Sequence, residues 1–221
     1  MATAGDINLP RSTNFMVNGR DQRLHFRFFL SDLESARSIV FFLHGYTGHS
    51  SRPEVQKAAA ILTSRDRALF CLEFAGHGYS EGVRALITNH DNLVDDAEGF
   101  IRRIMYGKTH NDEDFQCELS ADQWKSIQKK HFYVMGQSMG GGVAVFLSQR
   151  LESIDRFRGS VLLAPSLSTS MPHWLVVAAL ENTVGACLPE AEMPGKNTQY
   201  QPISHKRYQS TYITLYAFFI N

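Results

Sequence analysis

The spacing of apolar residues changes along the chain, and each spacing predicts a different element. Residues 23–30 (RLHFRFFL) alternate as a half-exposed strand does, and NGRD before them indicates a hairpin turn after the apolar FMV. Four later runs are continuously apolar, which is typical of strands covered on both faces. These runs are 39–43, 68–74, 131–136 and 159–165. We expect an antiparallel pair followed by parallel core strands.

Segments with helical spacing lie between these strands. Residues 53–65 begin with a proline and keep their apolar positions on one face. Residues 91–105 carry an apolar stripe, with acids early and arginines late, as the helix dipole favours. Residues 107–130 are polar, so we expect an exposed excursion with a short helix capped by Ser120. Strands that alternate with helices imply right-handed crossovers and a doubly wound α/β sheet.

The length, composition and net charge of the chain limit the classes of protein to which it can belong. The 221 residues, of which 43% are hydrophobic, suit a single domain over 1–221 with a substantial core. The 22 Lys and Arg residues balance the 22 Asp and Glu residues, which excludes a broad positive field for binding nucleic acid. The three cysteines lack metal-type spacing, so we expect buried or free thiols, no metal and no cofactor.

The start of the chain bears on localisation. Residues 1–11 are polar and contain no apolar signal segment. No run in the sequence reaches the roughly eighteen apolar residues that are needed to cross a bilayer. We therefore expect a cytoplasmic protein.

A serine stands where an apolar strand meets a helix. The pattern G-x-S-x-G, centred on Ser138, joins the run 131–136 to a helical segment. In such an elbow the serine is strained, and Gly136 and Gly140 are small because strand and helix approach closely there. Glycines in a first helical turn cost about 1 kcal/mol each relative to alanine, so helix propensity does not explain them. A glycine-rich turn with an incidental serine is the alternative, but the strand and helix around it favour a catalytic serine.

The first of the four apolar runs also ends in a loop with glycines, HGYTGHS. Ligands gather at the carboxyl edge of an open parallel sheet. In a serine hydrolase this loop supplies an oxyanion donor, so the backbone N–H of Tyr46 is a candidate beside that of Met139. An ordinary turn, with His44 as a structural hydrogen-bonding group, is the alternative. In a third loop, 73–86, the glycines serve tight turning, and we assign His77 no catalytic role.

The segments HGYTGHS, AGHGYSEG and GQSMGGGVA, in this order, resemble the α/β-hydrolase superfamily. Within it they look like the branch of monoacylglycerol lipases and lysophospholipases, which is grouped with serine aminopeptidase-like hydrolases. LLAPSLS matches the strand that leads into the lid of that branch. The resemblance covers about residues 15–188. It implies an α/β-hydrolase fold with a core sheet and helices over 15–166 and a partial cap over 167–200.

The resemblance also implies roles for single residues. Ser138 would be the nucleophile, and the backbone N–H groups of Tyr46 and Met139 would hold the oxyanion. A supporting motif would consist of His44, Gly45, Gly136 and Gly140. The substrate would be a small-molecule lipid ester. The apolar residues 171–189 of the cap would shield the acyl chain or make peripheral contact with a membrane, and ordinary core packing is the alternative for them.

The C-terminal part departs from the family pattern. An α/β-hydrolase places an acid and then a histidine after the serine, on loops that follow two further strands. The chain has no aspartate after Asp155. Other residues could replace the acid or the histidine, but they lie too close together in the sequence or in the wrong part of it for this pattern. These substitutes are Glu190, Glu192, His173 and His205. We therefore expect the C-terminal strands to be missing and residues 201–221 to form an atypical tail.

Three functions remain open at this stage. The first is a serine hydrolase of lipid esters, of the monoacylglycerol lipase or lysophospholipase type, that forms an acyl-enzyme on Ser138. The second is a truncated or catalytically inactive family member that binds acyl chains without turnover. The third is an amide-cleaving serine peptidase of the same fold.

Overall fold

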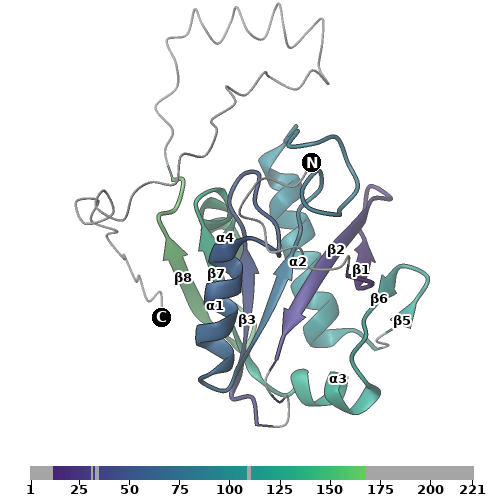
Figure 1. The fold of residues 1–221 in the computed structure, drawn as a ribbon, viewed down its shortest axis with the longest axis vertical. Coiled ribbons are helices and arrows are strands. Elements are labelled where there is room, and N and C mark those ends of the chain that lie inside the picture. The colour runs from purple at the N-terminus through teal and green to yellow at the C-terminus, as the bar shows by residue number, and fades with distance from the viewer. Residues whose placement is uncertain (1–11, 31, 33–34, 109–110, 168–221) are drawn as a thin grey trace, which may run out of the picture. The chain divides into compact units, whose positions relative to one another are not determined.

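The computed structural model describes residues 12–167, apart from 31, 33–34 and 109–110 (Figure 1). The strands are β1 (Phe15–Val17), β2 (Arg23–Phe29), β3 (Ser38–Leu43), β4 (Arg67–Leu72), β5 (Asn111–Asp112), β6 (Phe115–Gln116), β7 (His131–Gln137) and β8 (Phe157–Leu163). The helices are α1 (Pro53–Thr63), α2 (His90–Tyr106), α3 (Ala121–Ile127) and α4 (Met139–Leu151). Strands and helices alternate through most of the chain, which confirms the expected α/β class.

The strands form one mixed sheet with the order β5-β6-β1-β2-β4-β3-β7-β8. The strands β4, β3, β7 and β8 are parallel, while β2 pairs antiparallel with both β1 and β4. Phe15 lies opposite His25, which confirms the predicted opening hairpin. Leu43 is aligned with Gly136, so the loops that follow β3 and β7 leave the sheet side by side. The predicted site residues lie in the loop after β3 and at the junction of β7 with α4.

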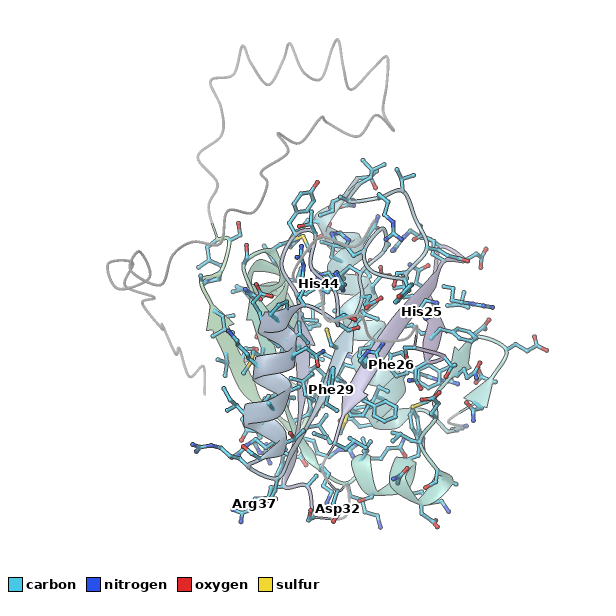
Figure 2. The ribbon with its side chains drawn as sticks, viewed as in Figure 1. His25, Phe26, Phe29, Asp32, Arg37 and His44 are labelled. Carbon is cyan, nitrogen blue, oxygen red and sulfur yellow. The ribbon has the colours of Figure 1, made fainter. Side chains whose placement is uncertain are left out.

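Two apolar clusters pack on opposite faces of the sheet. Helices α2 and α4 contribute to the larger cluster, whereas Val55 and Ala59 of α1 belong to the smaller one. Figure 2 shows Phe26 and Phe29 on β2; Phe26 is part of the larger cluster, and Phe29 packs against the smaller one. Every residue of β3 is buried, as expected of a central strand that is covered on both faces.

The expectation of an exposed excursion over 107–130 was wrong for part of that segment. Strands β5 and β6 form a short hairpin, and β6 extends the sheet by pairing with β1. Phe115 stacks on Phe26 with the ring centroids 5.5 Å apart, and it meets Trp124 edge-on at 5.6 Å. Strands of two residues are too short to show a spacing, so the sequence pattern could not reveal them.

The short helix predicted in the same segment is confirmed. Helix α3 begins with a capping box, in which the Ser120 hydroxyl accepts from the Gln123 N–H and the Gln123 side chain accepts from the Ser120 N–H. Trp124 and Ile127 are its buried residues. A seven-residue helix is marginal by itself, so both the cap and the buried side chains contribute to its stability.

Several expectations concern residues outside the described ranges. All of the partial cap except its first residue, the whole tail over 201–221, and Cys187 fall there. Within the described ranges, no helix combines the length and the apolar character needed to span a membrane, and no group of three His, Cys, Asp or Glu side chains is placed to hold a metal ion. Cys71 and Cys117 are buried free thiols, and burial raises the pKa of Cys117 to about 11.

Candidate active site

Ser138 occupies a sharp bend between the end of β7 and the start of α4. Its φ is 51° and its ψ is −117°, a conformation that residues with a side chain rarely adopt. The carbonyl oxygen of Ser138 accepts hydrogen bonds from the N–H groups of Gly141 (2.9 Å), Gly142 (3.2 Å) and Ser166 (2.9 Å). The Ser138 N–H donates to the carbonyl oxygen of Leu163 at 3.0 Å. The bend is therefore fixed on both sides of an exposed serine.

Two glycines flank this bend because the backbone leaves no space for side chains. A Cβ on Gly136 would lie 2.7 Å from the Cα of Gly141, and a Cβ on Gly140 would lie 2.6 Å from the carbonyl oxygen of His44. Real Cβ atoms essentially never come within 3.0 Å of such neighbours. The two glycines of the motif are therefore required by the close contact of α4 with β7 and with the end of β3.

The loop after β3 lies directly against the serine. A Cβ on Gly45 would be 3.2 Å from the Cβ of Ser138 and 3.8 Å from its Oγ. Tyr46 is the next residue, and Met139 is the first residue of α4. Within the described ranges, the backbone N–H groups of Tyr46 and Met139 donate no hydrogen bond. Two available N–H groups beside a hydroxyl, one of them at the positive end of a helix dipole, suit the binding of an oxyanion.

His44 links this loop to the loop after β4. Its Nε2 accepts a hydrogen bond from the Phe74 N–H at 3.1 Å, and its Nδ1 lies 2.8 Å from the carbonyl oxygen of Gly45. An Nε2 that accepts carries no proton, so Nδ1 is the donor and the ring is neutral. Burial lowers the pKa of His44 to about 3. The structure supports the role of a structural hydrogen-bonding group for this residue.

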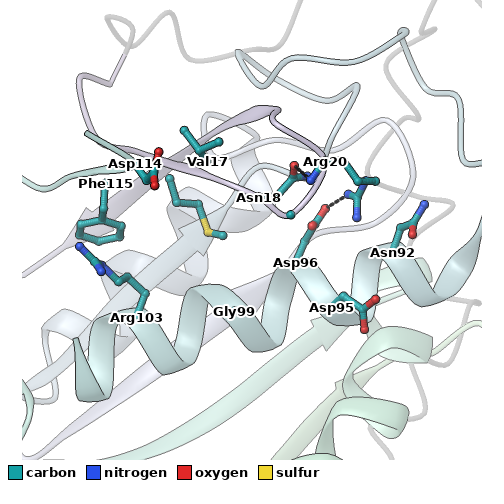
Figure 3. A pocket seen from close by; sticks show the side chains of 12 residues that line it. Val17, Asn18, Arg20, Asn92, Asp95, Asp96, Gly99, Arg103, Asp114 and Phe115 are labelled. Atoms are coloured by element: carbon teal, nitrogen blue, oxygen red, sulfur yellow. Dashed lines mark hydrogen bonds and ion pairs between the residues drawn. The ribbon is translucent and has the colours of Figure 1, made fainter. Parts of the chain in front are cut away.

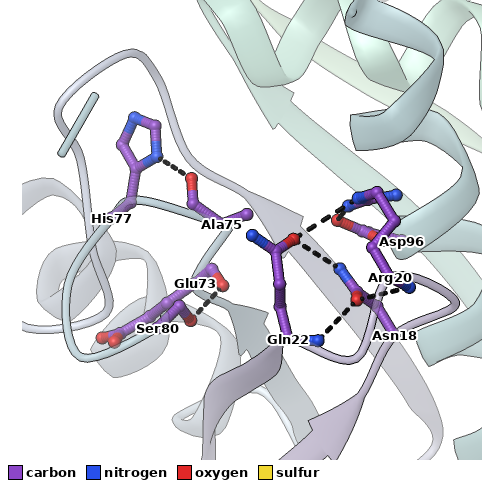
Figure 4. Close-up of polar contacts among 8 residues, drawn as sticks. All are labelled: Asn18, Arg20, Gln22, Glu73, Ala75, His77, Ser80 and Asp96. Atoms are coloured by element: carbon purple, nitrogen blue, oxygen red, sulfur yellow. Dashed lines mark hydrogen bonds and ion pairs between the residues drawn. The ribbon is translucent and has the colours of Figure 1, made fainter. Parts of the chain in front are cut away.

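His77 packs beside the same loop. Its ring centroid lies 5.2 Å from that of His44 and 6.0 Å from that of Tyr46. Its Nδ1 is 2.9 Å from the carbonyl oxygen of Ala75 (Figure 4), and burial is the main reason that its pKa is lowered. The Nε2 atom is buried and has no hydrogen-bond partner among the described residues. None of these contacts reaches Ser138.

The predicted site residues meet at one edge of the sheet, at the carboxyl ends of β3 and β7. They are Ser138, Tyr46, Met139, His44, Gly45, Gly136 and Gly140. Among the described residues, no histidine hydrogen-bonds the Ser138 Oγ, so none of them is positioned as its general base. The substitutes considered from the sequence, which fall between 173 and 205, lie outside those ranges.

Sequence reasoning missed one charged residue near this edge. Glu73 directly follows β4, is 2% exposed, and accepts hydrogen bonds from the loops on both sides of it. The position of Glu73 in the sequence could have revealed it. A carboxylate between an apolar strand and a glycine-rich loop is expected to be buried, and a buried carboxylate needs hydrogen-bond partners.

The cavity in Figure 3 belongs to another part of the molecule. It has a volume of about 470 Å³ and lies between the β1–β2 turn, α2 and β6. Its polar wall includes Arg20 and Asp96, which form an ion pair at 2.6 Å. Burial raises the pKa of Asp96, and the hydrogen bond from Arg20 acts in the opposite direction. None of the predicted site residues lines this cavity.

The fold and the elbow define the class of protein. Among similar solved structures are a monoacylglycerol lipase from Paleococcus ferrophilus, with a TM-score of 0.53 and 19% identity over 86% of this chain and 63% of that one, and a thioesterase domain from the curacin biosynthetic pathway, with a TM-score of 0.56 and 14% identity over 84% and 57%. Likeness at these identities concerns the fold alone. The fold is that of the α/β-hydrolases, as predicted.

The chain belongs to the serine aminopeptidase S33 family, whose model matches residues 34–214, more than half of its length. It is 29% identical over 154 residues to the monoglyceride lipase of Homo sapiens, a match that covers 68% of this chain and 42% of that protein. The monoglyceride lipase of Mus musculus is 27% identical over the same length and coverage. The match thus spans less than half of each of these relatives.

Proposed function

We propose that this chain carries the nucleophile and the oxyanion donors of a serine hydrolase that cleaves carboxylic esters of lipids, of the monoacylglycerol or lysophospholipid type. One observation carries the proposal: Ser138 is exposed at a bend with positive φ, and Gly45 of the neighbouring loop lies against it. The similarity to monoglyceride lipases supports a lipid ester as the substrate class.

In the proposed reaction, the Ser138 Oγ attacks the carbonyl carbon of the ester while its proton passes to a general base. The carbonyl oxygen becomes an oxyanion that the N–H groups of Tyr46 and Met139 stabilise. The bond between the carbonyl carbon and the alcohol oxygen then breaks, and the alcohol leaves with the proton from the base. Water attacks the acyl-enzyme in the same way, which releases the fatty acid and restores the serine hydroxyl.

The general base is the component that the described residues do not supply. A serine triad without one member loses several powers of ten in turnover and retains about 10³ to 10⁴ over the reaction in water. A family member that binds acyl chains without turnover is therefore the second candidate to test. The two candidates differ in whether Ser138 becomes acylated. Cleavage of amides in place of esters is a third candidate that substrate assays separate.

Replacing Ser138 with alanine is expected to abolish covalent labelling by an alkyl fluorophosphonate, because the probe bonds to the serine oxygen with loss of fluoride. Intact mass spectrometry of the 221-residue chain would show one adduct on the wild type and none on Ser138→Ala. Ser166→Ala is the matched control, since Ser166 is an exposed serine whose hydrogen bond to Ser138 comes from its backbone N–H, which the substitution retains. It is expected to label like the wild type.

Equal labelling of the wild type and Ser138→Ala, or no labelling of the wild type, would contradict the proposal. Fatty-acid binding that is undiminished by Ser138→Ala, without release of product from a monoacylglycerol, would support the second candidate. Faster hydrolysis of an amide than of the ester with the same acyl chain would support the third.

A further inference from the structure

Two consecutive residues after β4 anchor both ends of the loop that carries Tyr46. The Phe74 N–H donates to His44 at the start of this loop, at 3.1 Å. The Glu73 carboxylate binds Ser50 at the end of the loop. Between these anchors the loop turns tightly, with the Gly48 N–H donating to the Gly45 carbonyl oxygen at 2.9 Å. The hydrogen bonds made by Glu73 and Phe74 therefore help to fix the position of the Tyr46 amide.

The carboxylate of Glu73 connects the loops on its two sides. Its Oε1 accepts from the Ser50 N–H at 3.1 Å and from the Ser50 hydroxyl at 2.5 Å. Its Oε2 accepts from the Tyr79 N–H at 2.7 Å, which belongs to the loop after β4. The Glu73 carbonyl oxygen accepts from the Ser80 hydroxyl, and Figure 4 shows this hydroxyl turned toward it. Hydrogen bonds to an ionised acceptor are about twice as strong as neutral ones.

The glycine-rich loop is shaped around this carboxylate. Gly78 has φ +54°, and a Cβ on it would lie 2.8 Å from the Glu73 Oε1 and closer still to the Oε2. A side chain at this position would therefore displace the carboxylate. The glycine that the sequence suggested for tight turning also makes space for a buried acid.

We propose that Glu73 is a positioning residue whose carboxylate fixes the loop that presents the Tyr46 N–H to the oxyanion. The proposal rests on the proposed function of Ser138, because only then does the placement of this amide affect a reaction. Glu73 itself touches no reacting atom in this scheme. A displacement of about 1 Å in such a group can reduce a rate roughly 100-fold.

The decisive variant is Glu73→Gln in the full chain. The amide retains the size of the carboxyl group but replaces one acceptor oxygen with an NH₂ donor, which faces an N–H or O–H donor of Ser50 or Tyr79. Labelling of Ser138 by the fluorophosphonate is expected to slow about 10- to 100-fold. Amide hydrogen exchange of residues 44–50, followed by mass spectrometry, is expected to accelerate in the same variant.

The matched control is Asp96→Asn, which also converts a buried carboxylate to an amide. Asp96 is 2% exposed like Glu73, but its ion pair with Arg20 lies outside the two loops. This variant is expected to lose thermal stability while the labelling rate and the exchange of 44–50 stay as in the wild type.

Ser50→Ala is a milder second variant, which removes the 2.5 Å hydrogen bond between the Ser50 hydroxyl and Glu73 and keeps the one from the Ser50 N–H. In Ser50→Ala, labelling of Ser138 is expected to slow and hydrogen exchange of residues 44–50 to accelerate, as in Glu73→Gln. This variant is the deciding test if Glu73→Gln does not fold.

The results separate this proposal from the proposed function. Wild-type labelling and exchange in Glu73→Gln would overturn the positioning role, as would an equal slowing in Asp96→Asn, because general destabilisation would then explain both. If the wild type does not label, the proposed function fails, and exchange alone decides on Glu73. Faster exchange over 44–50 in Glu73→Gln but not in Asp96→Asn would then support its role in fixing the loop, and unchanged exchange would overturn it.

Discussion

The backbone of Ser138 combines strain with restraint. A residue with a side chain in such a conformation costs about 1–3 kcal/mol, so it persists only where the surroundings hold it. Here the N–H groups of Gly141, Gly142 and Ser166 converge on one carbonyl oxygen. Ser138 is the N-cap residue of α4, but its side chain makes no capping hydrogen bond, so the hydroxyl does not serve as an ordinary helix cap.

The glycines around this bend are expected to tolerate no side chain. Gly140→Ala would place a Cβ 2.6 Å from the carbonyl oxygen of His44 and should lower the free energy of unfolding by about 1–3 kcal/mol. Gly99→Ala on α2 is the matched control, because the nearest heavy atom to its Cβ would be the Met16 Cε at 3.8 Å. Gly99→Ala should stabilise the protein by roughly 0.5–1 kcal/mol. Urea unfolding of both variants tests this, and equal effects would contradict it.

At the scale of elements, α3 shows how a short helix depends on its first turn. Ser120→Ala removes the hydroxyl that accepts from the Gln123 N–H and should reduce the free energy of unfolding by about 1 kcal/mol. Ser126→Ala in the same helix is the control, and we expect it to be neutral or slightly stabilising. Thermal unfolding distinguishes the two. A Ser120→Ala variant as stable as Ser126→Ala would show that packing of Trp124 suffices.

The elements differ in how well the sequence predicts them. The core strands could be predicted from continuous apolar runs, and the opening hairpin, α1 and α2 from alternating or helical spacing. Helix α3 could be predicted from its Ser120 cap, and α4 from the glycine motif at its start. The β5–β6 hairpin could not, because its stability comes from pairing with β1 and from the contacts of Phe115. These contacts join residues that are far apart in the sequence. A local pattern contains no information about them.

The candidate site divides in a similar way. Ser138 and its flanking glycines follow from steric rules that act over a few residues, so the motif is sufficient to find them. The role of Glu73 depends on Ser50 and Tyr79, which reach it from two different loops. Such convergence becomes visible only when the chain is folded. The same holds for the neutral state of His44, which results from burial and from the Phe74 N–H.

For the whole molecule, buried neutral histidines make stability depend on pH. His44 has a pKa of about 3 when folded and the ordinary value of 6.5 when unfolded. Below pH 6.5 the unfolded chain binds a proton that the folded protein does not, so the free energy of unfolding should fall, by at most about 1.4 kcal/mol per pH unit for one such group. His77, whose pKa is also lowered, acts in the same direction.

Urea midpoints measured between pH 7 and pH 5 test this dependence. Asp96 has a raised pKa and acts in the opposite direction, because the folded protein binds that proton at a higher pH than the unfolded chain, whose ordinary value is 3.8. Its effect is the same in any variant that keeps Asp96, so it cancels when such a variant is compared with the wild type. The variant His44→Asn should therefore show a shallower loss of stability across the range than the wild type. Identical slopes for the two proteins would contradict the assignment of a neutral His44.

The pairing of β1 with β6 has a consequence for the newly made chain. Phe15 lies opposite Gln116, so the two strands are separated by about 100 residues, which a ribosome adds in roughly 5–20 s. Throughout that interval β1 has one unsatisfied side, on which another nascent chain could add a strand. The N-terminal side of the sheet is therefore completed only after residue 116 has been added to the chain.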